Sequence, residues 1–127
     1  MTLSDLKILI VDDEMIMREY LGDILADEGA IISKASSGEE GIELVKSNKF
    51  DLVITDVKMP GISGMEVLKS SRKILPQAKV IVMTAYSMDT SGEDFLKEGA
   101  VDFILKPFDL SEFRKAVFAI FGITSNL

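Results

Sequence analysis

Short apolar runs alternate along the chain with longer segments in which apolar residues recur at helical spacing. The runs are rich in Ile, Val and Leu, as expected of strands buried on both faces of a parallel sheet. They occupy 7–12, 30–35, 51–55, 79–84 and 101–105. We therefore predict five strands, each followed by a helix.

The first two intervening segments carry recognisable helix ends. An apolar stripe in the first consists of Met17, Leu21, Ile24 and Leu25. Gly29 follows it and suits the left-handed position that commonly ends a helix. The second helix is expected to start after Ser36 or Ser37, because each serine lies three residues before a glutamate, as in a capping box.

The remaining three segments also predict helices. The third helix covers about 64–75 and is followed by Pro76, and the fourth covers about 88–98 and is followed by Gly99. The fifth begins at Asp109, which forms a D-x-x-E cap with Glu112. Its predicted core stripe consists of Leu110, Phe113, Val117, Ile120 and Phe121.

Five β–α units in succession imply a parallel sheet with helices on both faces. Right-handed crossovers favour a doubly wound sheet in the strand order 2-1-3-4-5. The predicted fold class is therefore α/β, a flavodoxin-like (βα)5 domain. The 127 residues suit a single domain of this kind.

Composition narrows the chemistry that is available. The net charge of −7 argues against nucleic acid as a direct partner, since phosphate contacts need clustered Lys and Arg. The chain has no Cys and no His, so imidazole catalysis and Cys/His zinc sites are excluded. A metal would need oxygen ligands, which points to Mg²⁺, Mn²⁺ or Ca²⁺. The N-terminus does not resemble a signal peptide and no apolar run approaches a membrane span, so we expect a cytoplasmic protein.

Polar residues gather where the predicted strands end. The first predicted strand ends in Asp12 and is followed by Asp13. Asp56 follows the third strand, Thr84 ends the fourth, and Lys106 follows the fifth. Carboxyl ends of parallel strands share one edge of a sheet, and ligands bind there where the winding direction reverses. In the order 2-1-3-4-5 the first and third strands are neighbours, so the three carboxylates are expected to converge.

Three carboxylates in one crevice repel one another unless a cation offsets their charge. Mg²⁺ suits such a set, because it binds a few carboxylates and keeps open positions for a phosphate oxygen. The arrangement therefore predicts phosphoryl transfer, with a carboxylate nucleophile, a metal and a lysine that neutralise the phosphoryl group, and a hydroxyl donor. Taken singly, each residue also has an ordinary role, such as capping the following helix for Asp12 and Asp13.

The motifs "ILIVDDE", "DLVITDVKMPGISG", "VIVMTAY" and "GAVDFILKPF" resemble, in combination, the receiver domain of two-component response regulators, including the chemotaxis regulators. The resemblance covers about residues 6–121, and we expect the whole chain, 1–127, to be one receiver domain. It implies that Asp56 accepts a phosphoryl group from a phosphohistidine on a sensor histidine kinase or histidine phosphotransfer protein. Thr84 and Lys106 would contact the transferred group.

The resemblance also implies a metal site. Asp13 and Asp56 would bind Mg²⁺ or Mn²⁺, Asp12 would act mainly through water, and the backbone carbonyl of Lys58 would be a further ligand. No other cofactor is expected, and the domain would catalyse only its own phosphorylation and dephosphorylation.

Three side chains near the site are expected to regulate it. By resemblance, Thr84 moves on phosphorylation and lets the aromatic Phe103 turn inward, although Phe lacks the hydroxyl of the more common tyrosine. Lys58 and Tyr86 lie two residues beyond Asp56 and Thr84 and would shield the aspartyl phosphate from water. The face formed by the fourth helix, fifth strand and fifth helix would then bind an output domain, a target protein or a second copy.

Two alternatives belong to other classes. A pseudo-receiver would have the same fold and bind partners without being phosphorylated. An aspartyl-phosphate phosphatase would need D-x-D after its first strand, where this chain has Asp12 and Asp13 side by side. The identity of the kinase and of the output is not encoded in any motif of the chain.

Overall fold

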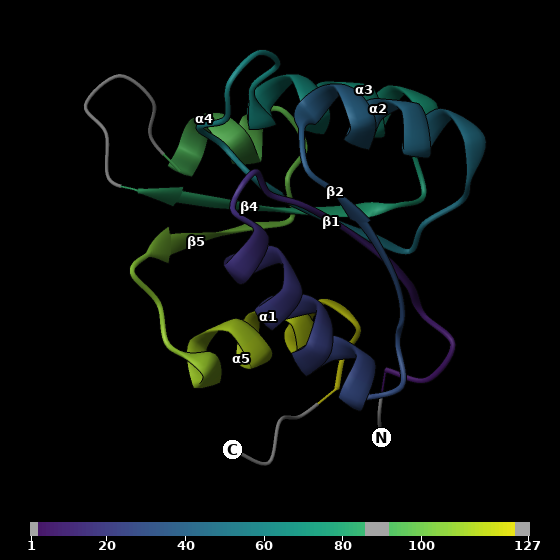
Figure 1. Ribbon diagram of the computed structural model, residues 1–127, viewed down its shortest axis with the longest axis vertical. Helices are drawn as coiled ribbons and strands as arrows, with labels where there is room; N and C mark the ends of the chain where they lie inside the picture. Colours follow the sequence, from purple (N-terminus) through teal and green to yellow (C-terminus); the bar gives the residue numbers. More distant parts are fainter. Residues whose placement is uncertain (1–2, 86–91, 124–127) are drawn as a thin grey trace.

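The computed structural model describes residues 3–85 and 92–123, and these form a parallel sheet covered by helices on both faces (Figure 1). The strands are β1 (Lys7–Val11), β2 (Ile31–Ala35), β3 (Leu52–Asp56), β4 (Lys79–Ala85) and β5 (Asp102–Lys106). The helices are α1 (Met15–Asp27), α2 (Gly38–Ser47), α3 (Gly64–Ile74), α4 (Gly92–Lys97) and α5 (Leu110–Ile120). The strand order β2-β1-β3-β4-β5 confirms the predicted fold class.

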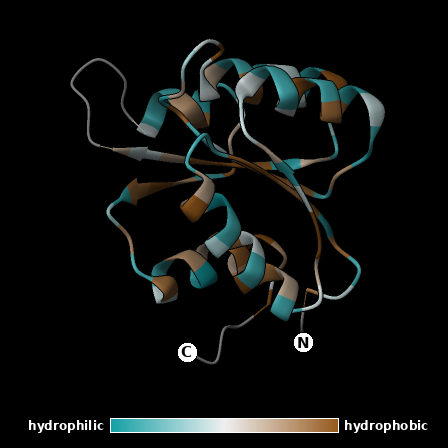
Figure 2. Cartoon of the chain, in the orientation of Figure 1, coloured by the Kyte–Doolittle hydropathy of each residue, from teal (hydrophilic) through white to brown (hydrophobic). Residues whose placement is uncertain are grey.

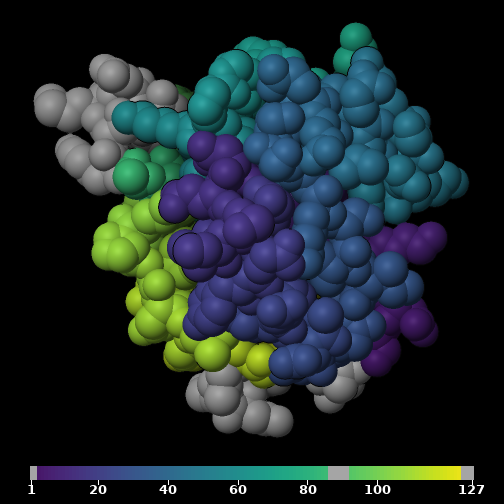
Figure 3. Space-filling model, viewed as in Figure 1, coloured from purple at the N-terminus to yellow at the C-terminus, as the bar shows by residue number. Residues whose placement is uncertain are grey.

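Helices α1 and α5 cover one face of the sheet, and α2, α3 and α4 cover the other (Figure 1). Successive residues of β1 alternate between two apolar cores: Ile8 and Ile10 join the α1/α5 side, Leu9 and Val11 the α2/α3/α4 side. The central strands are accordingly mostly hydrophobic, with polar residues near their ends, and the outer faces of the helices are largely polar (Figure 2). On the face shown in Figure 3, α1 lies between α5 and the β2–α2 region.

The register brings the carboxyl ends of neighbouring strands to one edge. Val11 of β1 pairs with Thr55 of β3, and Asp56 of β3 pairs with Met83 of β4. The Lys106 end of β5 is aligned with the last residue of β4. Side chains placed just beyond these residues therefore meet at one edge of the sheet.

Four of the five strands end one residue away from the predicted position, and two of these shifts concern the aspartates. Asp56 belongs to β3, because it continues the ladder with β4. Asp12 lies beyond β1, since its Oδ1 accepts a hydrogen bond from the backbone N–H of Glu14 at 2.9 Å as the chain turns into α1. The shift of one residue leaves both carboxylates at the same edge.

The predicted caps form, with one refinement. Ser37 caps α2, because its Oγ accepts the N–H of Glu40 at 3.1 Å, while Glu40 in turn accepts the N–H of Ser36 at 2.6 Å. The two serines thus share the capping interactions. Asp109 caps α5 by accepting the N–H of Glu112 at 2.8 Å.

The predicted core stripe of α5 was wrong at its first position. Leu110 is 39% exposed, whereas Phe113 is buried. Phe108, which precedes the helix, stacks on Phe113 with ring centroids 5.9 Å apart and joins the core in place of Leu110. Helix α4 begins at Gly92 in the described part of the chain, and the first residues of its predicted range, 88–91, lie outside that part.

No helix among the described residues is both long enough and apolar enough to span a bilayer.

Candidate functional site

Three aspartates meet at the carboxyl edge of β1 and β3. One carboxylate oxygen from each of Asp12, Asp13 and Asp56 lies within 4.8 Å of the others. Asp12 and Asp56 are buried, and Asp13 is exposed to solvent. The cluster therefore has two fixed, desolvated carboxylates and one that solvent can reach.

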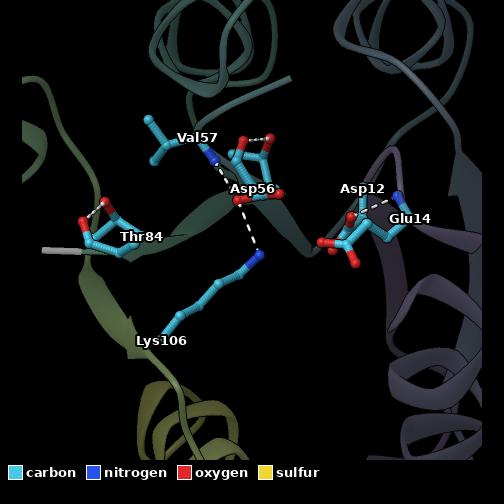
Figure 4. Close-up of polar contacts among 8 residues, drawn as sticks. Asp12, Glu14, Asp56, Val57, Thr84 and Lys106 are labelled. Carbon is cyan, nitrogen blue, oxygen red and sulfur yellow. Dashed lines mark hydrogen bonds and ion pairs between the residues drawn. The ribbon is translucent and has the colours of Figure 1, made fainter. Parts of the chain in front are cut away.

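Asp56 is held by donors on one of its two carboxylate oxygens. The Nζ of Lys106 lies 3.1 Å from Oδ1, and the backbone N–H of Val57 donates to the same oxygen at 2.8 Å. Figure 4 shows Asp56 between Thr84 and Asp12, with the Lys106 side chain extending from the end of β5 toward it. Oδ2 takes neither of these two bonds.

Asp12 also uses only one of its two carboxylate oxygens for hydrogen bonding. Its Oδ1 accepts from Glu14, as described above, while Oδ2 is buried with no hydrogen-bond partner among the described residues. A buried oxygen without a donor is costly unless a cation or water binds it. Three carboxylates with such an orphan oxygen fit a hard divalent cation such as Mg²⁺.

Burial raises the pKa of both buried aspartates above the ordinary value of 3.8. For Asp12 the N–H of Glu14 opposes this rise, and the charge of Asp56 adds to it. For Asp56 the charge of Lys106 is the main opposing influence on the pKa. Ionising both buried aspartates is therefore unfavourable in the protein alone, which favours binding of a cation.

Thr84 and Phe103 occupy positions that differ in exposure. Thr84 is buried, and its hydroxyl donates to the carbonyl of Ala85 at 3.0 Å. Phe103 is half-buried against the α2/α3/α4 core. Its ring lies against Gly92 at the start of α4, so closely that a Cβ on that glycine would be 2.2 Å from the ring Cζ.

The loop after β3 lines an open pocket whose walls do not include the three aspartates. The pocket has a volume of about 560 Å³ and is lined by Val57, Lys58, Met59, Pro60, Ser63, Met65 and Phe95. The Lys58 side chain is exposed at its rim. Tyr86, the other residue expected to shield the site, lies outside the described residues.

One contact of the site was missed by the sequence reasoning. Arg18 of α1 donates from Nη1 to the backbone carbonyl of Asp12 at 2.7 Å. The contact depends on the angle at which α1 leaves β1, and no spacing rule in the sequence encodes that angle.

Comparison with known proteins decides the family. The model of the response regulator receiver domain matches residues 8–118. The chain belongs to this family. Membership makes it a phosphoacceptor signalling domain of two-component or phosphorelay systems and not a classical enzyme. The acidic cluster at the carboxyl edge of the sheet is the pocket of that receiver domain.

Individual relatives cover nearly the whole receiver domain. This chain is 37% identical over 120 residues to sporulation initiation phosphotransferase F of Bacillus subtilis, and the match covers 94% of this chain and 97% of that protein. TrrA of Thermotoga maritima, solved with Mg(2+)-BeF, is 40% identical with a TM-score of 0.79, covering 91% and 98%. A chain of the CheX-CheY-BeF3-Mg+2 complex of Borrelia burgdorferi is 30% identical with a TM-score of 0.85, covering 93% and 90%.

Proposed function

We propose that Asp56 is the phosphoacceptor of this receiver domain. The observation that carries the proposal is that Asp56 lies between groups of opposite charge. The ammonium of Lys106 is 3.1 Å from its Oδ1, and the carboxylates of Asp12 and Asp13 lie beside it. A nucleophile on a rigid strand end, between an ammonium and a cation-binding pair, suits transfer of a highly charged group. Asp12 and Asp13 then serve the cation rather than the phosphoryl group directly.

The chemical step follows from the bonds on Asp56. Lys106 and the N–H of Val57 both bind Oδ1, so Oδ2 is the oxygen placed to attack phosphorus. The new O–P bond forms as the P–N bond of the donor phosphohistidine breaks, and the electron pair of that bond returns to the imidazole nitrogen. Lys106 neutralises part of the negative charge on the transferred group.

We propose Mg²⁺, or Mn²⁺ in its place, as the cation. Asp13, Asp56 and the backbone carbonyl of Lys58 would hold it directly, and Asp12 would act mainly through water. Bound there, the cation supplies positive charge to the phosphoryl oxygens and a template for in-line transfer. Support comes from the unpartnered Oδ2 of Asp12 and from the Mg(2+)-BeF bound by TrrA, a 40% identical relative.

Two further pairs are proposed to control the signal. Thr84 would exchange its bond to Ala85 for one to the phosphoryl group, and Phe103 would move with it. Lys58 and Tyr86 would restrict the approach of water and lengthen the lifetime of the aspartyl phosphate. The exposed position of Lys58, two residues beyond Asp56, supports its part of this proposal.

We propose two kinds of protein partner. The phosphodonor is a sensor histidine kinase or a histidine phosphotransfer protein, in keeping with the phosphotransferase relative from Bacillus subtilis. The output face is α4–β5–α5, which would contact a target, an output domain or a second copy. It displays the exposed apolar side chains Leu96, Val101, Leu105 and Leu110.

The receiver unit is proposed to be a single domain with its core at about residues 6–121, in line with the matched range 8–118. We propose that it works in the cytoplasm, where ATP supplies phosphohistidine donors.

Intact mass spectrometry tests the proposal. The protein is incubated with acetyl phosphate and Mg²⁺, beside an Asp56→Asn variant and a sample in excess EDTA. We expect one added phosphoryl group in the wild type with Mg²⁺ and none in either control. Modification of Asp56→Asn to the same extent would reject Asp56, and absence of both modification and Mg²⁺ binding would favour a phosphorylation-independent interaction module.

A further inference from the structure

Arg18 makes a contact that the proposed chemistry does not use. It lies in the first turns of α1, half-buried, and its Nη1 donates to the backbone carbonyl of Asp12 at 2.7 Å. Partial burial of a guanidinium costs desolvation free energy, and holding it in one position costs side-chain entropy. The contact with Asp12 must offset both costs. Its partner is the first residue of the acid pair.

The turn that carries Asp12 is fastened by three bonds. The N–H of Asp12 donates to the carbonyl of Ala35 at 3.1 Å, which continues the β1–β2 ladder. Its Oδ1 accepts from the N–H of Glu14, which starts α1. Arg18 supplies the third bond, to the Asp12 carbonyl, and is the donor among these three that belongs to a side chain.

These bonds leave a single polar atom of the Asp12 side chain unused. Oδ2 is buried without a hydrogen-bond partner among residues 3–85 and 92–123, and the carboxylate lies beside those of Asp13 and Asp56. Rotation of the Asp12 backbone would move this oxygen out of the cluster and would also displace the adjacent Asp13. The Arg18 bond opposes that rotation.

We infer that Arg18 is a positioning residue, which holds the Asp12–Asp13 turn in the shape that binds the divalent cation. The inference rests on the proposed function, since it concerns the same cation. Outer residues that orient metal ligands typically contribute ten- to a hundred-fold in metal affinity. Because Arg18 acts here through a backbone carbonyl, we expect the lower end of that range.

A competing explanation is that Arg18 acts only through its charge. Its Nη1 binds a neutral carbonyl, whereas the ammonium of Lys106 approaches a carboxylate directly. Removing that positive charge would by itself tighten the binding of a cation, and this effect would be screened at high salt, where the Debye length falls to a few ångströms. An effect of geometry would persist.

The chain offers a matched control in Arg72. This residue also donates from a helix to backbone carbonyls, those of Pro76 at 3.0 Å and Ala78 at 2.7 Å. Both acceptors lie in the turn between α3 and β4, at the opposite edge of the sheet from the aspartates. Replacing Arg72 removes two hydrogen bonds of the same kind at a place remote from the aspartates.

The experiment compares Mg²⁺ binding by the wild type, Arg18→Met and Arg72→Met, followed by NMR of ¹⁵N-labelled protein in low and high KCl. We expect about ten-fold weaker binding by Arg18→Met at both salt concentrations, with Arg72→Met close to the wild type. The amide signal of Glu14, which reports the Asp12 Oδ1 bond, should also shift in Arg18→Met before Mg²⁺ is added. Thermal unfolding of both variants controls for loss of stability.

Binding by Arg18→Met within two-fold of the wild type would overturn the inference while leaving the proposed function intact. Tighter binding by Arg18→Met in low KCl that returns to the wild-type level in high KCl, or a deficit shared equally by Arg72→Met, would overturn it as well. If the wild type itself does not bind Mg²⁺, the proposed function fails and the inference fails with it. Should Arg18→Met not fold, Arg18→Lys, which keeps the charge but loses the planar donor geometry, is titrated under the same criteria.

Discussion

At the scale of single residues, the buried aspartates are held in the structure at a cost in stability. Burial raises the pKa of Asp12 above 3.8, and the charge of Asp56 raises it further, against the opposing N–H of Glu14. A carboxyl with a higher pKa in the folded protein than in the unfolded chain is harder to ionise when folded. Its ionisation therefore destabilises the fold, fully at pH values above the raised pKa and not at all well below 3.8.

The variant Asp12→Asn tests this cost. Asn keeps the acceptor that binds the N–H of Glu14 and removes the charge. Without divalent cations at pH 7, we expect Asp12→Asn to be more stable than the wild type by about 1–2 kcal/mol, the order of a partly buried like-charge interaction. Urea unfolding across a pH series measures the difference.

The sign of the pH dependence distinguishes this account from simple repacking. The advantage of Asp12→Asn should shrink as the pH falls toward 3.8, because the wild-type carboxyl then becomes neutral in both states. Mg²⁺ should also reduce the stability difference between Asp12→Asn and the wild type, since the cation stabilises the wild-type carboxylate cluster. An Asp12→Asn variant that is less stable at pH 7, or whose advantage grows on acidification, contradicts the account.

Residue types at strand ends were sufficient to predict that the aspartates and Lys106 converge, but not the contacts that support them. Asp12, Asp56 and Lys106 follow apolar runs directly, so their convergence follows from the strand order alone. The Arg18 contact depends on helix orientation. The contact between Phe103 and Gly92 depends on how the start of α4 packs on β5, which the spacing of residues does not specify.

At the scale of elements, α4 and β5 meet through that last contact. The ring of Phe103 occupies the space in which a side chain at residue 92 would begin, with a Cβ only 2.2 Å from the ring. A protein core seldom absorbs such overlap without moving a side chain or the backbone. Gly92 is therefore required by the present position of the ring.

We expect Gly92→Ala to destabilise the protein by about 1–2 kcal/mol, because overpacking outweighs the better helix propensity of alanine. In a Phe103→Ala background the same change should be neutral or stabilising, since the ring is gone. A double-mutant cycle from urea unfolding measures this coupling. Equal effects of Gly92→Ala in both backgrounds would mean that the ring and the glycine do not determine each other's position.

Helix α5 is tied to the end of α1 by an ion pair. Arg114 and Glu28 form a salt bridge with side chains only 16% and 21% exposed, and the Arg114 guanidinium also lies 5.0 Å from the centroid of the Phe118 ring. Partial burial and the second contact make this pair stronger than an ordinary surface pair. The pair therefore helps to fix the position of α5 against α1.

We expect Arg114→Met to lower the free energy of unfolding by about 1–3 kcal/mol, because it leaves Glu28 without its cation in a partly desolvated position. The exposed pair of Lys46 and Glu43 is the control, and Lys46→Met should change stability by less than about 0.5 kcal/mol. Both values come from urea unfolding at neutral pH. Similar small losses in the two variants would show that the α1–α5 connection is held by apolar packing alone.

Element boundaries were predictable where a cap or a glycine marks them, as at Ser37, Gly29 and Asp109. They were less predictable where tertiary contacts decide. Leu110 follows the helical pattern of α5 but is exposed, because the preceding Phe108 packs on Phe113 instead. A periodicity rule counts only residues within the helix and cannot anticipate a competitor from the loop.

At the scale of the whole molecule, the parallel sheet brings the reactive side chains together at the carboxyl ends of its strands. The order β2-β1-β3-β4-β5 makes β1 and β3 neighbours, so two strand ends supply the acid cluster and β5 supplies the lysine. The two apolar cores on either side hold these strands rigidly. The proposed output face α4–β5–α5 includes β5, the strand that ends in Lys106, so the site and that face share one structural element.

The central claim is that Asp56 receives the phosphoryl group, and the most direct test is to locate the modification on the whole protein. After treatment with acetyl phosphate and Mg²⁺, borohydride reduction converts an aspartyl phosphate to homoserine, which peptide mass spectrometry assigns to a position. The account predicts homoserine at residue 56, dependent on Mg²⁺, and none at the neighbouring Asp51 or at Asp12 and Asp13. Homoserine at one of those three aspartates, with residue 56 still aspartate, would contradict it.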